Sequence, residues 1–272
     1  MIYIKSDLID ELLAMSKYSG ILGDITEKGN FGYTKYELEV DEKISKEIGK
    51  NVGHYVTINC SRIFSYLKKV QNYVSNKLAK SIGEFISKIN NPLILVVGLG
   101  NGGMVADSLG VECSKKLLIT EGVPDDIKNG LGRLCYLEPK VKGVTGINSF
   151  DVVKGVVDRI KPDFVFAIDT LCSNDISRLM CSFQLSNAGV APGAGVNNRT
   201  QVLNSKSLGT NVLAIGVPLI ISGENLEVKN KEYNDLHFTI KEIDFYIKAC
   251  SNIISRAINI AVHGDVYKKY DF

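Results

Sequence analysis

Hydrophobic residues gather in short, unbroken runs from Leu93 onward. The runs cover residues 93–97, 116–120, 164–168 and 212–217, and helical or glycine-rich segments separate them. Strands buried on both faces of a sheet lack polar alternation, and strands that alternate with helices usually form a parallel sheet. The pattern predicts an α/β fold in which a mainly parallel or mixed sheet is flanked by helices.

The N-terminal third shows two other periodicities. Residues 33–40 alternate between polar and apolar side chains, which indicates a half-buried strand, and residues 54–58 predict a second one. Apolar residues at helical spacing then continue from Ile63 to Ile89 and stop before Pro92. We therefore expect two strands followed by a long amphipathic helix.

Helical spacing also marks both ends of the chain. Near the start it involves Leu8, Leu12 and Leu13, and near the end it extends over residues 239–262. No internal repeat or linker interrupts the sequence, so we expect a single domain over residues 1–272.

Composition and charge match those of an ordinary globular protein, with 45% hydrophobic and 23% charged residues. The 32 basic and 30 acidic residues leave a net charge of +2, which provides no general attraction for nucleic acid or for an anionic membrane. We therefore expect no direct nucleic-acid partner.

The six cysteines show neither a C-x-x-C pair nor the spacing of a disulfide framework, so we expect reduced thiols. The N-terminus lacks the charged and apolar regions of a signal peptide, and no segment reaches the roughly 18 consecutive apolar residues that span a bilayer. These features predict a cytoplasmic protein without a membrane partner.

A glycine-rich loop follows the run 93–97 and reads Gly98-Leu99-Gly100-Asn101-Gly102-Gly103. It fits the pattern G-x-G-x-x-G, and Glu121 lies near the distance expected for a ribose-binding acid, which together are typical of a dinucleotide-binding Rossmann protein. A tight turn from strand to helix would need the same glycines. Both interpretations are open at this point.

Two aspartates follow predicted strands. Asp107 falls in the first turns of the helix expected after the glycine loop, where a carboxylate would repel a bound phosphate but would also favour the helix dipole. Asp169 ends the run 164–168, either as a helix N-cap or at the sheet edge where open α/β folds bind ligands. Because both acids follow the carboxyl ends of strands, their side chains can meet at one edge.

A series of ordered motifs resembles the spore germination protease family. The main ones are residues 96–101 (VVGLGN), 106–110 (ADSLG), 143–147 (GVTGI), 161–169 (KPDFVFAID), 192–199 (PGAGVNNR) and 213–218 (LAIGVP). Residues 6–8 (SDL), 48–57 (IGKNVGHYVT) and 241–244 (KEID) extend the likeness over nearly the whole chain.

This resemblance implies an endopeptidase of the spore core that begins the degradation of small acid-soluble spore proteins during germination. Substrates would be cut at short motifs with acidic residues on the non-primed side. The resemblance also implies a fold similar to the hydrogenase-maturation peptidases, a homotetramer, and a zymogen that removes a short N-terminal segment itself. The equivalent self-cleavage point is the Asp7-Leu8 bond, and Asp107 and Asp169 match the family's two proposed catalytic aspartates.

The chemistry of two close carboxylates agrees with this role. Because they cannot both ionise cheaply, they share a proton, so that one acts as the base that activates water and the other as the acid that assists the leaving amine. No cofactor is implied. The same oxygens could hold a metal, but H-E-x-x-H is absent and the three histidines are far apart in sequence, so no metal ligands are assigned.

Weaker candidates lie on the glycine-rich segments. Gly98, Gly100 and Asn101 could donate hydrogen bonds to a developing oxyanion, and Arg199 could pair with an acidic substrate side chain. A tight turn and a solvated loop arginine are the simpler interpretations. A family member that has lost catalysis and serves as a spore scaffold is a further alternative.

Overall fold

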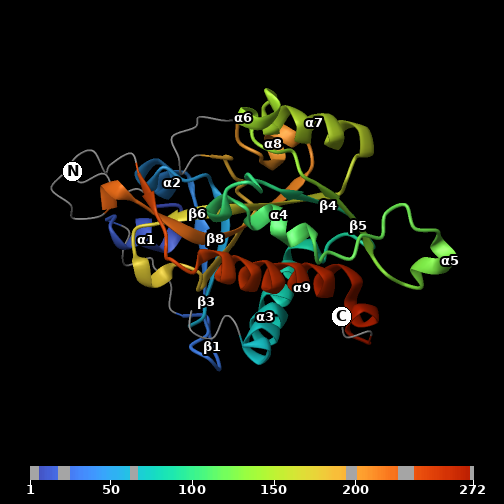
Figure 1. The fold of residues 1–272 in the computed structure, drawn as a ribbon, viewed down its shortest axis with the longest axis horizontal. Helices are drawn as coiled ribbons and strands as arrows, with labels where there is room; N and C mark the ends of the chain where they lie inside the picture. Colours follow the sequence, from blue (N-terminus) through green and yellow to red (C-terminus); the bar gives the residue numbers. More distant parts are fainter. Residues whose placement is uncertain (1–5, 18–24, 62–66, 194–200, 226–235, 270–272) are drawn as a thin grey trace.

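The structure is a computed structural model that describes residues 6–17, 25–61, 67–193, 201–225 and 236–269. Within these ranges nine strands form one mixed sheet in the order β1-β2-β3-β7-β8-β6-β4-β5, and β9 pairs with β8 (Figure 1). The strands are β1 (Glu27–Lys28), β2 (Thr34–Val40), β3 (Gly53–Asn59), β4 (Leu93–Gly98), β5 (Arg133–Leu137), β6 (Phe164–Ser173), β7 (Ser182–Ser186), β8 (Asn211–Ser222) and β9 (His237–Phe238).

Helices lie on both faces of this sheet, which confirms the predicted α/β layered fold. They are α1 (Ile9–Ala14), α2 (Glu42–Ile48), α3 (Lys68–Ile86), α4 (Leu109–Ser114), α5 (Asp125–Lys128), α6 (Lys142–Thr145), α7 (Ser149–Ile160), α8 (Ser205–Leu208) and α9 (Ile243–Lys269). The strands predicted at residues 33–40 and 54–58 are confirmed as β2 and β3, and the predicted long helix is α3.

The sheet has a parallel half and an antiparallel half. Strands β5, β4, β6 and β8 run parallel, and three of them begin in the hydrophobic runs that predicted them. β7, β3, β2 and β1 continue the sheet by antiparallel pairing. Ser182–Ser186 escaped prediction because its polar residues interrupt any continuous hydrophobic run.

The prediction of a strand at residues 116–120 is wrong. This stretch carries no regular structure, and the parallel neighbour of β4 is β5 instead. Side chains of α9 satisfy its backbone: the Leu118 N–H donates to Asn259 Oδ1 at 2.9 Å, and the Leu118 carbonyl lies 2.9 Å from His263 Nε2. The run therefore lies against α9 without forming a strand, with Leu117 buried and Ile119 exposed.

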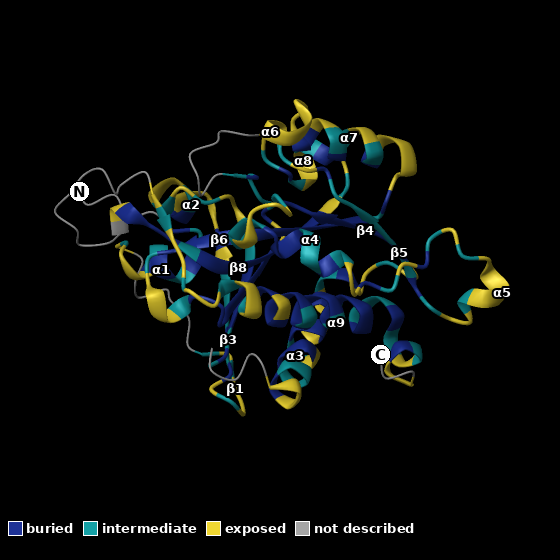
Figure 2. Cartoon of the chain, in the orientation of Figure 1, coloured by how far each residue is buried: buried dark blue, intermediate teal, exposed yellow. Residues whose placement is uncertain are grey.

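The two faces of the sheet have separate hydrophobic cores. Alternate residues of β4, among them Ile94 and Val96, pack with the buried sides of α3, α4 and α9 on one face. The residues between them, such as Leu95 and Val97, pack with α7 and α8 on the other. Figure 2 shows the sheet as the buried centre between these helices.

A third cluster joins α1 and α2 to the antiparallel half of the sheet through Ile9, Ile44 and Tyr55. Tyr55 alternates with Val56, which belongs to the α3/α9 core, so α1 and α2 cover the same face as α7 and α8. The α1/α2 group and the α7/α8 group cover different parts of that face (Figure 1). The stretch of sheet between the two groups is where the candidate site lies.

Candidate active site

A cavity of about 1200 Å³ lies over this stretch of sheet. Its lining includes Lys50 just after α2, Ser149 at the start of α7, and Gln184 of β7. On β7 the apolar residues Phe183 and Leu185 face the α3/α9 core, so the alternating Gln184 points to the opposite face and supplies a polar floor. The sequence pattern of β7 thus builds a polar, concave site.

Asp169 lies on the floor of this cavity, within β6. Contrary to the expectation, the strand does not end here, and Asp169 is no helix N-cap, because β6 continues its pairing with β8 as far as Ser173. The other neighbour, β4, makes its last pairing between Gly98 and Ile168. Asp169 is therefore the first residue beyond the carboxyl end of β4, which leaves open space beside it.

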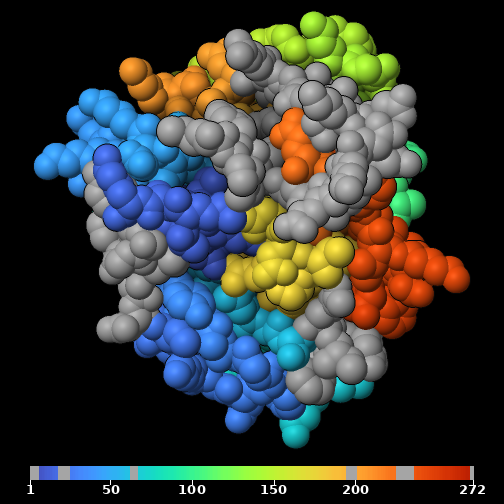
Figure 3. Space-filling view, turned by 90° about the vertical axis from the view of Figure 1, so that its left-hand side faces the viewer, coloured from blue at the N-terminus to red at the C-terminus, as the bar shows by residue number. Residues whose placement is uncertain are grey.

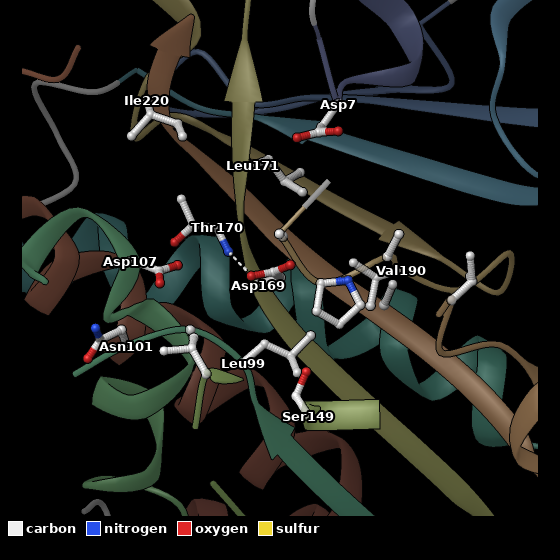
Figure 4. A pocket seen from close by; sticks show the side chains of 18 of the residues that line it. Asp7, Leu99, Asn101, Asp107, Ser149, Asp169, Thr170, Leu171, Val190 and Ile220 are labelled. Carbon is white, nitrogen blue, oxygen red and sulfur yellow. Dashed lines mark hydrogen bonds between the residues drawn. The ribbon is translucent and has the colours of Figure 1, made fainter. Parts of the chain in front are cut away.

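Asp107 lies in a short 3₁₀ turn, η3 (Val105–Asp107), that precedes α4. The expectation of a place inside the helix is wrong, because α4 begins only at Leu109. The Asn101 N–H donates to the Asp107 carbonyl at 3.0 Å, which fastens the turn to the glycine loop. Figure 4 shows the side chains of Asp107 and Asp169 lying beside each other in the cavity.

Burial alters the acidity of both groups, and repulsion adds to the effect at Asp169. Burial raises the pKa of Asp107 to about 6, and a backbone hydrogen bond from Asn101 opposes the change. Asp169 is only 8% exposed. Burial raises its pKa well above the ordinary value, the charges of Asp107 and then Asp7 raise it further, and the Thr170 N–H that donates to its Oδ1 at 2.9 Å opposes the change. The pair therefore retains a proton at a pH where exposed carboxylates have lost theirs.

The hydroxyl of Thr170 lies in the same cavity. Its Oγ1 is buried and has no hydrogen-bond partner among the described residues. A buried hydroxyl without a partner costs free energy, so such groups are often found where a water or a substrate completes the site. Sequence reasoning missed this residue because a threonine after a strand aspartate carries no motif of its own.

The glycine loop packs closely against the segment that follows Asp107. A Cβ on Gly98 would lie 2.4 Å from the Gly110 carbonyl oxygen, so the loop and the segment that follows Asp107 touch through their backbones. The N–H groups of Leu99 and Asn101 donate to the carbonyls of Ile168 and Asp107. Gly100 and Asn101 both line the cavity, and the Asn101 side-chain oxygen accepts from the Gly103 N–H at 3.0 Å.

Glu121 is engaged elsewhere. Its carboxylate accepts two hydrogen bonds from Arg133, at 2.7 Å and 3.1 Å, and this ion pair lowers the pKa of Glu121. The expected second strand of a Rossmann unit, residues 116–120, does not form. Glu121 and residues 116–120, which the dinucleotide interpretation needs as a ribose-binding acid and a second strand, therefore have structural roles instead.

The remaining candidates lie in different places. Asp7 lines the cavity, while Leu8 beside it is fully buried. Arg199 lies outside the described residues. Among the described residues no three His, Cys, Asp or Glu side chains converge as a metal-binding group. His237 lines the cavity, whereas His263 is buried against Leu118.

Lys50 and Gln184 are cavity residues that sequence reasoning passed over. The Lys50 Nζ lies 3.0 Å from Asp7 Oδ1, and Gln184 Nε2 donates to the Asp7 carbonyl at 3.2 Å. Lys50 belongs to the motif at residues 48–57, so its position was marked although no role was assigned. No local pattern distinguishes Gln184 from any polar residue of a half-buried strand.

Known proteins match this sequence over most of its length. The model of the germination protease family matches residues 13–233. Curated relatives named germination protease include that of Clostridium tetani, 32% identical over 82% of this chain and 82% of its own, and that of Caldanaerobacter subterraneus, 32% identical over 98% of this chain and 96% of its own. The chain belongs to the germination protease family. The prediction of a protease with a role in germination is confirmed at this level.

One family relative is matched over a smaller part of its length. The germination protease of Bacillus licheniformis is 36% identical over 74% of this chain and 56% of its own. Among solved structures, the [NiFe] hydrogenase maturation protease HycI of Thermococcus kodakarensis covers 63% of this chain and 92% of its own with 17% identity and a TM-score of 0.37, which is too low to carry an argument. No helix in the described ranges is both long and apolar enough to cross a membrane.

Proposed function

We propose that this chain is an endopeptidase that begins the degradation of small acid-soluble spore proteins during germination, and that Asp107 and Asp169 form its catalytic pair. The observation that carries the proposal is the placement of two carboxylates with raised pKa side by side in one open cavity. Family membership supports proteolysis, and the cavity supports a peptide-sized substrate.

The mechanism follows from one shared proton. Asp169, the more buried acid, holds the proton, and Asp107 in its ionised form removes a proton from water that attacks the peptide carbonyl. The Asp169 proton then passes to the leaving amine as the C–N bond breaks. Repulsion between the acids favours the singly protonated state that this cycle requires.

Thr170 and Asn101 complete this scheme. The Thr170 hydroxyl lies near the Asp107 carboxylate in Figure 4 and can orient the attacking water, because it has no hydrogen-bond partner among the described residues. The Asn101 amide is the donor in the lining that we assign to the developing oxyanion. Thr170 would position the water and Asn101 would donate a hydrogen bond to the oxyanion, and neither forms a covalent bond with the substrate.

The remaining expectations from the family resemblance belong to the same proposal. We propose self-processing at the Asp7-Leu8 bond, assembly as a homotetramer, action in the spore core without a cofactor, and pairing of Arg199 with an acidic substrate side chain. The position of Asp7 in the lining of the cavity supports the first of these.

The deciding experiment is a cleavage assay. The purified chain is incubated with a small acid-soluble spore protein, and fragments are identified by mass spectrometry. Asp107→Asn and Asp169→Asn should each abolish cleavage while circular dichroism stays unchanged, and Asp151→Asn, on the exposed side of α7, should cleave like the parent. Full activity in either of the first two variants would remove that residue from the mechanism.

Two alternatives make different predictions in the same set of assays. A dinucleotide-binding protein would show saturable binding of a nicotinamide or flavin nucleotide, through Gly98, Gly100, Gly103 and Glu121. The Arg133 contacts of Glu121 argue against this. A family member without catalysis would keep its fold and cut no spore protein.

A further inference from the structure

The first turn of α4 lies directly on the glycine loop. A Cβ on Gly110 would lie 2.6 Å from both the backbone nitrogen and the carbonyl oxygen of Leu99, and a Cβ on Gly98 would lie 2.4 Å from the Gly110 carbonyl oxygen. Neither glycine therefore has room for a side chain. Because Gly110 comes three residues after Asp107, this contact fixes the segment that carries the acid against the end of β4.

Tyr136 of β5 adds a polar contact to the same turn. Its hydroxyl donates to the Gly110 carbonyl at 3.3 Å and lies 2.3 Å from the position of a Cβ on Gly98. Leu134, the alternate residue of β5, is buried in the same core as α4, so the side chain of Tyr136 points to the face of the sheet that α4 covers. The hydroxyl thus stands where β4, β5 and α4 meet.

The phenol of Tyr136 keeps its proton while Asp107 titrates. Burial raises the pKa of Tyr136 to about 12, a hydrogen bond with Ser114 opposes the change, and the charge of Glu138 adds to it. The pKa of Asp107 is about 6. The hydroxyl is therefore available as a donor to Gly110 in both protonation states of the acid.

The turn that carries Asp107 is packed on one side and open on the other. The Asp107 N–H donates to the Met104 carbonyl at 2.9 Å, and the Asp107 carbonyl accepts from the Asn101 N–H at 3.0 Å, so these bonds tie the loop to itself. The side chains of Met104 and Val105 are exposed. The hydrogen bond from Tyr136 differs from the others, because it ties this loop to a neighbouring strand of the sheet.

We propose that Tyr136 is a positioning residue of the aspartate pair, which keeps Asp107 beside Asp169 by holding the Gly110 carbonyl. The proposal rests on the proposed function, because it assigns catalysis to that pair. Tyr136 is not among the described residues that line the cavity, so it acts through Asp107 and does not touch the substrate. Figure 3 views the molecule from the end opposite to β5, where the first described residues, in dark blue, lie beside the yellow stretch that follows β6.

The test measures the acidity of Asp107 without turnover. The full chain, labelled with carbon-13 at its aspartate carboxyl groups, carries Asp169→Asn so that Asp107 titrates alone, and Asp107→Asn identifies its signal in the NMR spectrum. The midpoint should lie near pH 6. Tyr136→Phe removes only the hydroxyl and releases the turn toward solvent, so the midpoint should move down by about one pH unit, toward the ordinary value of 3.8.

Tyr33→Phe is the matched control. Tyr33 is a buried tyrosine near the other edge of the sheet, and its hydroxyl donates to Glu27 Oε2 at 3.3 Å. This variant also loses one hydrogen bond and should lower the midpoint of urea unfolding, but it should leave the Asp107 titration unchanged. The comparison separates positioning from a general loss of stability, and circular dichroism verifies that each variant is folded.

Kinetics supply a second measurement. With Asp169 intact, Tyr136→Phe should lower kcat about tenfold or more and leave KM nearly unchanged, because a misplaced acid affects the chemical step. An Asp107 midpoint that stays in place in Tyr136→Phe, or that moves equally in Tyr33→Phe, would overturn the positioning role, even if kcat falls.

The two proposals fail separately. If the parent cuts no spore protein, the proposed function fails, while a shifted titration still shows that Tyr136 holds Asp107. If the parent cuts spore protein and the titration does not shift, the positioning role alone fails.

Discussion

Gly100 lies directly against Asp107. A Cβ on Gly100 would lie 2.0 Å from the Asp107 carbonyl oxygen and 2.9 Å from its Oδ1. The backbone of Gly100 also has a φ of +102°, in the region that favours glycine. A motif that suggests phosphate binding from sequence therefore acts in this fold as the surface on which a proposed catalytic acid rests.

Replacing Gly100 by alanine should displace Asp107 and lower cleavage by about a hundredfold, because misplacing a reacting group by about 1 Å can have that effect. Gly122→Ala is the control for backbone strain, since Gly122 also has a positive φ, +85°, but a Cβ added there would meet no atom within 4 Å. It should therefore leave cleavage unchanged. Both variants should lose about 1 kcal/mol or more in urea unfolding. Wild-type activity in Gly100→Ala would contradict the assigned contact.

Asp107 should make stability depend on pH. Its pKa rises from 3.8 to about 6 on folding, so the folded chain keeps a proton that the unfolded chain has lost. The stabilisation is full below pH 3.8 and is lost as the pH rises through about 6. Relative to Asp107→Asn, the parent should therefore lose about 1–3 kcal/mol of unfolding free energy between pH 4 and pH 7.

Urea unfolding followed by circular dichroism at several pH values measures this difference. The comparison with Asp107→Asn cancels the titrating groups that lie away from Asp107, among them Glu27 and Glu121, whose pKa values are lowered by their ion pairs. Asp169 contributes to the measured difference, because the charge of Asp107 raises its pKa. Asp151→Asn should show no such pH-dependent difference. A constant difference between the parent and Asp107→Asn would mean that Asp107 is not desolvated.

Thr170→Val should separate activity from stability. The valine keeps the shape of the side chain but removes a buried hydroxyl that lacks a partner among the described residues, so unfolding free energy should stay equal or rise by about 1 kcal/mol. Cleavage should fall about tenfold or more if the hydroxyl orients the attacking water. Thr170→Ser, which keeps the hydroxyl, should retain most of the activity, and full activity in the valine variant would exclude the positioning role.

Self-processing should shorten the chain to one that begins at Leu8. Mass spectrometry of protein stored at mildly acidic pH would detect the loss of residues 1–7, and Asp169→Asn should prevent it. Because Leu8 is buried and the Ile9 N–H is bound to Gln184, the remaining segment should stay docked after cleavage. An unchanged mass in the active parent would count against processing without affecting proteolysis of other substrates.

Much of the parallel core was predictable because its signal is local. A run such as residues 164–168 is apolar at every position, which is what burial on both faces requires. The same signal misled at residues 116–120, because a helix can bury an apolar run as well as a sheet can. β7 was not predicted, although its polar and apolar residues alternate as they do in β2, because five residues make only a short signal; its Gln184 and Ser186 face the cavity.

The sequence by itself determined the type of fold and the family, and it singled out the two aspartates as candidates, because hydrophobic periodicity and ordered motifs are properties of neighbouring residues. Tertiary structure decided the site. Asp169 lines the cavity because β4 ends opposite Ile168, Asp107 is placed by its contact with Gly100, and Lys50 meets Asp7 at the end of β6. These relationships depend on relative strand lengths and on contacts between distant segments, which no local pattern encodes.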